Sequence, residues 1–298
     1  MKNRLTYRFI VLGIVVVISR IVSYEVQEII GLCLIVLGGI PHGANDWRVD
    51  QLLSGKINLK SPSIRFFIRY LLVALGFVLV WILMPFRALI IFLVISAYHF
   101  GQSEMERILT TPENKRLPFL LWGVFALGFP LILHWGETIR YIETLTATQL
   151  PLINSTPIIL ITVSSILILF LLFQTASNQI NGSQLGYLLT SMAILILIFS
   201  TTSLLLGFAV YFVVWHSTDA IHLQLEFINR KKKYEIKNWI KDTMPFSILA
   251  IFFLVAVMFL IEFDDVQSLG ALVFIFISAI TIPHMLITEK MVDSKLNA

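Results

Sequence analysis

Four histidines lie where long apolar segments of the chain end, and each has polar or aromatic neighbours. They are His42, His99, His216 and His284. Neutral imidazole is a common ligand of iron, zinc and copper. An ionisable side chain at membrane depth is costly and mostly faces the interior of a helix bundle. Four such residues in similar places therefore predict a metal site.

The composition of the rest of the chain predicts a membrane scaffold around this site. Of the 298 residues, 57% are apolar and only 13% are charged, whereas about a quarter of the residues of soluble domains are charged. A membrane-spanning helix needs about 20 mostly apolar residues. Ten segments are candidates: 8–23, 26–41, 65–84, 87–101, 117–135, 157–173, 184–200, 203–216, 246–261 and 269–287. The sequence predicts an all-α polytopic membrane protein, a bundle of about ten transmembrane helices that forms one integral-membrane domain over residues 1–298.

Segment order places the four histidines at one membrane depth. His42, His99, His216 and His284 lie near the C-terminal ends of the second, fourth, eighth and tenth segments. Even-numbered segments all run toward the same side of the membrane, so the predicted metal site lies in that half. His134 ends an odd-numbered segment, and we expect it to lie on the opposite side and to take no part.

The placement of lysine and arginine predicts which half this is. All but three of the 22 basic residues fall on the side of both termini, and cytoplasmic loops are enriched in these residues. We therefore expect both termini, and the metal site, on the cytoplasmic side of the cell (inner) membrane. The basic run 230–233 then lies close to anionic membrane lipids, and we expect no nucleic-acid partner. The single cysteine, Cys33, excludes a disulfide framework and a thiolate metal site.

One apolar run, 185–216, is too long for a single span. As one helix it would extend about 48 Å at the 1.5 Å rise per residue of an α-helix. Three polar residues interrupt it, Thr201, Thr202 and Ser203. We expect the chain to turn there, which divides the run into two spans.

Three acidic residues follow histidines closely and predict hydrogen-bond support for the metal ligands. They are Asp46, Glu104 and Asp219. A metal-bound imidazole usually donates its second N–H to a carboxylate or carbonyl. The alternative is that these acids are the first solvated residues of loops, and it is nearly as good for Glu104 and Asp219. Asp46 is the stronger candidate because it is embedded beside Trp47 and Arg48.

Proline directly precedes two of the histidines, in Pro41-His42 and Pro283-His284. A proline inside a helix removes a backbone hydrogen bond and bends the helix. Membrane helices tolerate such breaks where the freed groups are buried in protein or line a cavity. The two dipeptides therefore favour a site inside the bundle.

Aromatic residues gather near the same helix ends and predict a pocket for a long apolar substrate. The candidates for its wall are Trp47, Tyr98, Phe100, Tyr211 and Trp215. Tyr98 and Trp215 are preferred because each directly precedes a predicted ligand. The alternative is an aromatic belt at the membrane interface or packing against lipid.

Four short motifs resemble those of the Brp/Blh family, membrane β-carotene 15,15′-dioxygenases of bacteria and archaea. They are Pro41-His42-Gly43-Ala44 with Asp46, Tyr98-His99-Phe100-Gly101 with Glu104, Trp215-His216-Ser217, and Pro283-His284-Met285. The resemblance runs from about residue 38 to residue 286. It implies an Fe(II) cofactor, with O₂ and β-carotene from the bilayer as substrates. It also implies cleavage of the central double bond into two molecules of retinal, which are passed to a microbial rhodopsin.

The chain departs from the family pattern at one position. Members of the family carry a second histidine four residues after the one that matches His216, and this chain has Ala220 there. Either His284 completes the ligand set, or local unwinding lets His222 reach the metal, or the chemistry is altered. We favour His284 as the fourth ligand.

Other functions also use histidines inside a membrane. A di-iron hydroxylase or desaturase needs many histidines, often in closely spaced pairs, and this chain has six histidines in all. The main alternative is a membrane transporter or a haem-binding electron carrier, in which His42 and His99 would hold the haem.

Overall fold

The structure is a computed structural model that describes residues 2–55, 62–109, 115–230, 233–261 and 265–296. Within these ranges every regular element is a helix, so the predicted all-α class is confirmed. Nine helices of this described part are long and apolar enough to cross a membrane. They correspond to nine of the ten predicted segments. The remaining one, 8–23, lies in helix α1 (Lys2–Ile21), which contains four basic residues. Two residues of the basic run, 231 and 232, fall outside the described ranges.

Two compact units divide the chain, and each is built from two separate stretches. Unit 1 comprises Met1–Cys33 and Leu93–His216, and unit 2 comprises Leu34–Phe92 and Ser217–Ala298. The single domain inferred from the sequence stays a prediction.

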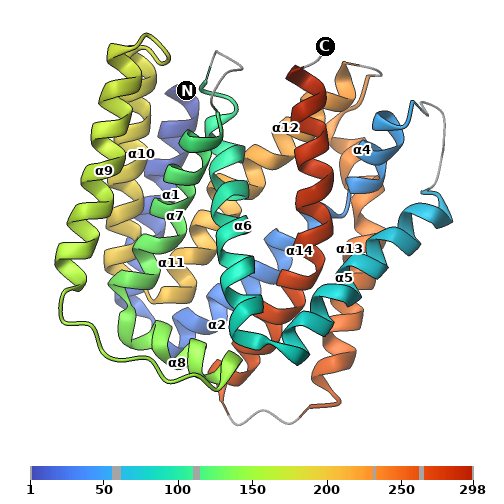
Figure 1. The fold of residues 1–298 in the computed structure, drawn as a ribbon, viewed down its shortest axis with the longest axis horizontal. Helices are drawn as coiled ribbons and strands as arrows, with labels where there is room; N and C mark the ends of the chain where they lie inside the picture. Colours follow the sequence, from blue (N-terminus) through green and yellow to red (C-terminus); the bar gives the residue numbers. More distant parts are fainter. Residues whose placement is uncertain (1, 56–61, 110–114, 231–232, 262–264, 297–298) are drawn as a thin grey trace. The chain divides into compact units, whose positions relative to one another are not determined.

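Unit 1 is a layer of helices in which α1 packs against α10 and α7 packs against α9. Figure 1 shows α9 and α10 running side by side at one edge of this unit. Its elements after α1 are α2 (Tyr24–Leu34), the C-terminal part of α6 (Pro85–Met105), α7 (Arg116–Leu133), α8 (Trp135–Thr146), α9 (Thr156–Ala176), α10 (Gly182–Thr201), α11 (Leu204–Tyr211) and the π-helical segment η2 (Phe212–Ser217). The sequence did not predict α8, because its polar and charged residues alternate with apolar ones.

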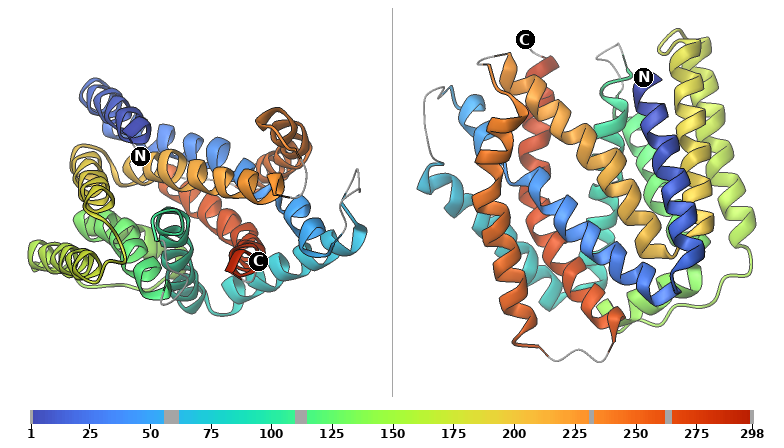
Figure 2. Two further views of the ribbon diagram at one scale, coloured as in Figure 1. Left: turned by 90° about the horizontal axis from the view of Figure 1, so that it is seen from above. Right: turned by 180° about the vertical axis from the view of Figure 1, so that it is seen from behind.

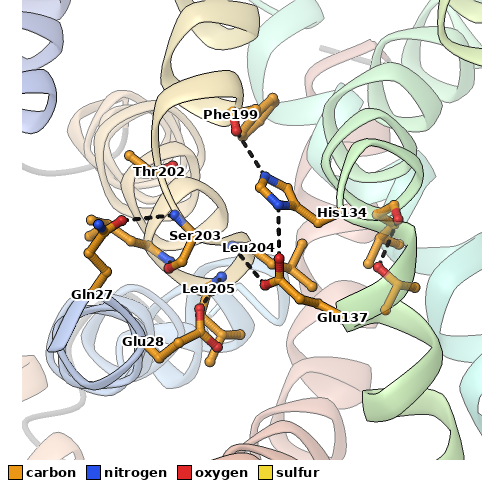
Figure 3. A network of polar contacts seen from close by, with 12 residues as sticks. Gln27, Glu28, His134, Glu137, Phe199, Thr202, Ser203, Leu204 and Leu205 are labelled. Carbon is orange, nitrogen blue, oxygen red and sulfur yellow. Dashed lines mark hydrogen bonds and ion pairs between the residues drawn. The ribbon is translucent and has the colours of Figure 1, made fainter. Parts of the chain in front are cut away.

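The predicted turn at residues 201–203 is confirmed, since α10 ends at Thr201 and α11 begins at Leu204. Side chains from α2 and α8 accept hydrogen bonds from the first N–H groups of the new helix (Figure 3). Gln27 Oε1 lies 2.9 Å from Ser203 N, Glu28 Oε1 lies 3.2 Å from Leu205 N, and Glu137 Oε2 lies 3.4 Å from Leu204 N. Helix N-termini leave such groups without intrahelical acceptors and favour negative charge. We call Gln27, Glu28, His134 and Glu137 the capping network.

Unit 2 is organised around the long helix α14 (Val266–Leu296), which packs against α5 (Ile64–Leu83) and α4 (Asp46–Leu53). Figure 2 shows α14 alongside these helices from two further directions. The other elements are the π-helical segment η1 (Ile35–Gly39), α3 (Ile40–Gly43), the N-terminal part of α6, α12 (Thr218–Asn229) and α13 (Ile236–Met258). A buried apolar cluster that includes Val49, Leu223 and Trp239 joins α4, α12 and α13.

Candidate metal centre

The four predicted ligands are almost completely buried, and each unit contains two of them. The exposed fractions are 4% for His42 and 2%, 1% and 2% for His99, His216 and His284. In unit 1 the ring centroids of His99 and His216 are 4.9 Å apart. In unit 2 those of His42 and His284 are 4.8 Å apart. Buried imidazoles in contact with each other are costly unless something binds them, so each pair is a candidate part of a metal site.

In unit 1, helix α6 holds the imidazole of His216 from two sides. Phe100 stacks on the His216 ring with 4.1 Å between centroids and 16° between planes. One helical turn further on, Ser103 Oγ lies 3.0 Å from His216 Nδ1. His99 is on the same helix, so residues 99–103 supply one predicted ligand and fix the orientation of another.

A glycine allows α6 and α7 to approach at this point. A Cβ atom added to Gly101 would collide with the backbone carbonyl of Phe119. Only glycine fits there without moving the helices apart. His99 precedes Gly101 by two residues on α6. It therefore lies beside a close contact of two helices that tolerates no larger side chain at Gly101.

A buried ion pair connects α6 to the segment that carries His216. The Arg8 guanidinium donates to both carboxylate oxygens of Glu104, at 3.1 and 3.0 Å. It also lies over the indole of Trp215, 4.6 Å from the ring centroid. Arg8 Nη1 also lies 2.6 Å from Tyr187 OH and 2.8 Å from Ser191 Oγ, which accept hydrogen bonds from it. Glu104 was predicted to support a histidine, but its carboxylate binds Arg8 instead. The guanidinium of Arg8 also covers the indole of Trp215, the residue before His216.

In unit 2, a break in the helix supplies the partner of His42. Pro41 has no N–H, and it follows the π-helical segment η1, in which hydrogen bonds span an extra residue. His42 Nδ1 donates to the carbonyl oxygen of Gly39. From α12, Gln224 Nε2 donates to the backbone oxygen of His42 at 3.0 Å. Hydrogen bonds therefore hold both the side chain and the backbone carbonyl of His42.

The second histidine of unit 2 is held by a carboxylate. His284 Nδ1 lies 2.8 Å and 3.0 Å from the two oxygens of Asp46. Tyr70 OH is 3.5 Å from the same carboxylate and donates to the Ile280 carbonyl at 2.9 Å. Asp46 therefore provides the predicted carboxylate–histidine contact, and it does so for His284, from the other end of the sequence.

These contacts determine which ring nitrogen of His42 and of His284 carries the proton. A carbonyl and an ionised carboxylate can only accept a hydrogen bond. His42 and His284 must therefore carry the proton on Nδ1. In a neutral imidazole, Nε2 is then the unprotonated nitrogen that can bind a metal. This arrangement is the usual outer shell of a histidine metal site.

The remaining candidate ligands and supports are placed as follows. His222 lies on α12 with its side chain exposed, unlike the four buried histidines. Asp219 is buried in the first turn of the same helix. Both belong to unit 2, as does Asp46.

The predicted pocket residues fall into two groups. Phe100 and Tyr211 are buried and stack on each other in unit 1, with 5.8 Å between centroids. Tyr98 packs against Phe119, also in unit 1. In unit 2, Trp47 is buried, with the Arg48 guanidinium 4.1 Å above its ring. Whether these aromatic side chains contact a substrate stays a prediction.

His134, expected to take no part, has both ring nitrogens within hydrogen-bond distance of an oxygen, one in the capping network and one on the backbone of α10 (Figure 3). Nδ1 lies 3.0 Å from Glu137 Oε1, and Nε2 lies 2.9 Å from the Phe199 carbonyl oxygen. Burial alone would lower the pKa of His134, but the hydrogen bonds with Glu137 and Phe199 and the charges of Glu137 and Glu28 raise it. The pKa of Glu137 is lowered, because hydrogen bonds from His134 and Tyr24 outweigh burial.

Comparison with known proteins identifies the family of the chain. The sequence model of the β-carotene 15,15′-dioxygenase family matches residues 33–292. The chain belongs to this family. It is also 26% identical over 265 residues to a β-carotene 15,15′-dioxygenase from an uncultured marine bacterium, with 87% of this chain and 91% of the relative covered. No solved structure matches the chain.

The dioxygenase family match includes all four buried histidines, since His42 and His284 lie well inside residues 33–292. The buried histidines of the described residues are compatible with a metal site. A carotenoid dioxygenase is an oxidoreductase, and neutral imidazole is a common ligand of transition metals.

Several residues that support the site were not found from the sequence. Ser103, Gln224 and Tyr70 are ordinary polar residues on helices, and nothing in their spacing points to a histidine. Arg8 was counted among the basic residues that set membrane orientation, but the residue is only 2% exposed.

Proposed function

We propose that this chain is a membrane enzyme that uses Fe(II) and O₂ to split the central 15,15′ double bond of β-carotene. The bond between the two central carbons breaks, each carbon gains one oxygen atom of O₂, and two molecules of retinal are released. The observation that carries the proposal is the family match over residues 33–292, which contains every predicted ligand.

We further propose that His42, His99, His216 and His284 hold the iron. Each is buried, and His42 and His284 have Nδ1 bound to an acceptor that leaves Nε2 as the basic nitrogen. Neutral imidazole is a suitable ligand for iron. Bound Fe(II) would supply the activation of O₂. The carboxylate of Asp46 would raise the basicity of His284 and fix its ring.

In this proposal, His284 replaces the family's second histidine as the fourth ligand, because this chain has Ala220 at that position. It is buried beside His42 and carries a carboxylate partner, whereas the side chain of His222 is exposed. A ligand with a hydrogen-bonded second nitrogen is already oriented for metal binding. These contacts favour His284 over His222 as the fourth ligand.

The protein would bind and orient the polyene and exclude water from it. β-Carotene dissolves in the bilayer, so it would enter from the lipid. Trp47, Tyr98, Phe100, Tyr211 and Trp215 are the proposed lining. Phe100 and Tyr211 stack together, and Phe100 also stacks on His216, so this part of the wall directly adjoins a ligand. The proposed enzyme lies in the cell (inner) membrane with both termini cytoplasmic, and its retinal would supply a rhodopsin.

The proposal is tested in cells that make β-carotene. Cells that express the chain should accumulate retinal and lose carotene, and His42→Ala should abolish both changes. His134→Ala serves as the matched control, because it removes an imidazole that the proposal does not use. Undiminished carotene and no retinal, with the protein present in the membrane, would refute the activity. A haem absorption band in the purified protein would favour the electron carrier instead.

A further inference from the structure

Ser103 makes two hydrogen bonds with a single hydroxyl proton, and this restricts how they are arranged. Its Oγ lies 2.9 Å from the Phe100 carbonyl oxygen and 3.0 Å from His216 Nδ1. A serine hydroxyl has one proton to donate and can also accept. The Phe100 carbonyl can only accept, so both contacts are hydrogen bonds at the same time only when the Ser103 proton points to that carbonyl. The second contact is then a hydrogen bond only if His216 Nδ1 carries the proton and donates to Ser103.

We infer that Ser103 is a positioning residue that selects the Nδ1–H form of His216 and so leaves Nε2 as its metal-binding nitrogen. This inference rests on the proposed function, because it concerns a ligand of the proposed iron. The two forms of a neutral imidazole differ little in energy without a partner, and a hydrogen bond to one nitrogen decides between them. Ser103 does for His216 what Gly39 and Asp46 do for His42 and His284.

The surroundings hold Ser103 in place for this task. Phe100, one turn earlier, stacks on the same imidazole and prevents it from turning away. On the next residue, Glu104 binds Arg8 through both carboxylate oxygens, and Arg8 covers Trp215, the residue before His216. The segments 103–104 and 215–216 are therefore connected twice, directly by the Ser103 hydroxyl and through Arg8, which binds Glu104 and covers Trp215. Ser103 is 4% exposed, so water has little access to replace its hydroxyl.

The test combines a direct observation of the imidazole with metal affinity. Full-length protein labelled with ¹⁵N-histidine is purified in detergent and stripped of metal, and NMR reports which nitrogen of His216 carries the proton. The His216 signal is identified by its loss in His216→Asn. Fe(II) affinity is measured without oxygen against a competing chelator. Wild type should show Nδ1–H, and Ser103→Ala should lose this preference and bind Fe(II) about 10- to 100-fold more weakly, as for other second-sphere changes.

Ser96→Ala is the matched control. Ser96 is a buried serine on the same helix, and no acceptor or donor within hydrogen-bond distance of its hydroxyl is found in the described structure. Its replacement removes the same atom from a similar environment and should change neither the His216 signal nor the affinity.

A second pair of variants keeps the test valid if Ser103→Ala does not fold. Ser103→Thr and Ser103→Val have nearly the same shape and differ in the hydroxyl. Only the threonine variant should keep Nδ1–H and the wild-type affinity. Equal behaviour of the two, or a wild-type His216 protonated at Nε2, would overturn the role of Ser103 while retinal production by the wild type persists. A wild-type protein that binds no Fe(II) and makes no retinal would overturn the proposed function instead.

Discussion

His134 and His216 both lie in unit 1 and both have largely buried side chains. Their ring nitrogens differ in the hydrogen-bond partners that surround them. Both nitrogens of His134 face oxygens that accept, from Glu137 and the Phe199 carbonyl. This arrangement is satisfied by an imidazolium ion paired with a carboxylate. At His216 the hydrogen bond found is at Nδ1, to Ser103, and the ring is stacked on Phe100.

The difference shows that burial alone does not identify a metal ligand. An imidazole with acceptors at both nitrogens is stabilised as a cation, and a cation cannot bind a metal. An imidazole with one acceptor is stabilised in one neutral form, which has a basic nitrogen to offer. The number of acceptors therefore separates a histidine that is paired with a carboxylate, as His134 is, from one that could bind a metal.

The largest expected effect comes from removing one imidazole of each kind. His216→Ala should abolish retinal formation and lower the iron content of the purified protein. His134→Ala should retain activity and iron, and should unfold more easily by about 1–3 kcal/mol because hydrogen bonds to a charged group are lost. Retinal yield, metal analysis and thermal unfolding are measured for both variants. Loss of iron from His134→Ala, in protein that remains folded, would contradict the comparison.

The ion pair beside His216 should matter more than an exposed one. Arg8→Met leaves Glu104 buried without its partner, which typically costs about 3–5 kcal/mol. The control is Arg69→Met, which removes an ion pair to Asp50 in which the arginine side chain is 57% exposed. Such surface pairs contribute about 0–1 kcal/mol. Thermal unfolding in detergent compares the two variants, and equal destabilisation would show that the Arg8 cluster does not support the fold.

The His134–Glu137 pair should make stability depend on pH. The raised pKa of His134 means that its contribution is complete below the ordinary value of 6.5 and is lost as pH rises through the folded pKa. The lowered pKa of Glu137 means that its contribution is complete above 4.5 and is lost as pH falls through the folded pKa. The melting temperature should therefore decline on both sides of this range, less steeply in His134→Ala. An unchanged alkaline decline in that variant would assign the effect to other groups.

The smallest expected effect concerns the cap itself. Gln27 accepts a hydrogen bond from Ser203 N and donates one to the Ser19 carbonyl at 3.2 Å. Gln27→Ala should cost about 1 kcal/mol, as for other helix caps, and should leave iron content unchanged. Gln149→Ala, at an exposed position after α8, is the control. A drop in iron content in folded Gln27→Ala would show that the cap also positions His216.

Most of the helical framework could be predicted because it depends on long apolar runs. The turn at Thr201–Ser203 was also predictable, since three polar residues interrupt such a run. Helix α8 was not, because its sequence alternates polar and apolar residues and does not resemble a span. Helix α1 forms where a span was expected, and buried Arg8 shows that a basic residue near a terminus can belong to the interior.

The four histidines could be predicted from segment order, but their partners could not. Ser103 contacts a residue 113 positions away, and Asp46 contacts one 238 positions away. Spacing along one helix suggests only neighbours within a turn or two, which is why Asp46 and Glu104 were assigned to the histidines that precede them. The actual partners depend on how separate helices pack, and a single sequence does not encode that in a local pattern.

The direction in which His42 and His216 point depends on the number of residues in the two π-helical segments. Segment η1 ends just before Pro41-His42, and η2 contains His216. Each such wide turn holds an extra residue, and one residue in an α-helix corresponds to about 100° of rotation about the axis. Exchange of one apolar residue for another within Ile35–Gly39 or Phe212–Ser217 leaves the number of residues, and so the direction of the histidine, unchanged. A deletion of one residue there would rotate the following imidazole by more than a quarter of a circle, so natural variation in these turns should change their composition and keep their length.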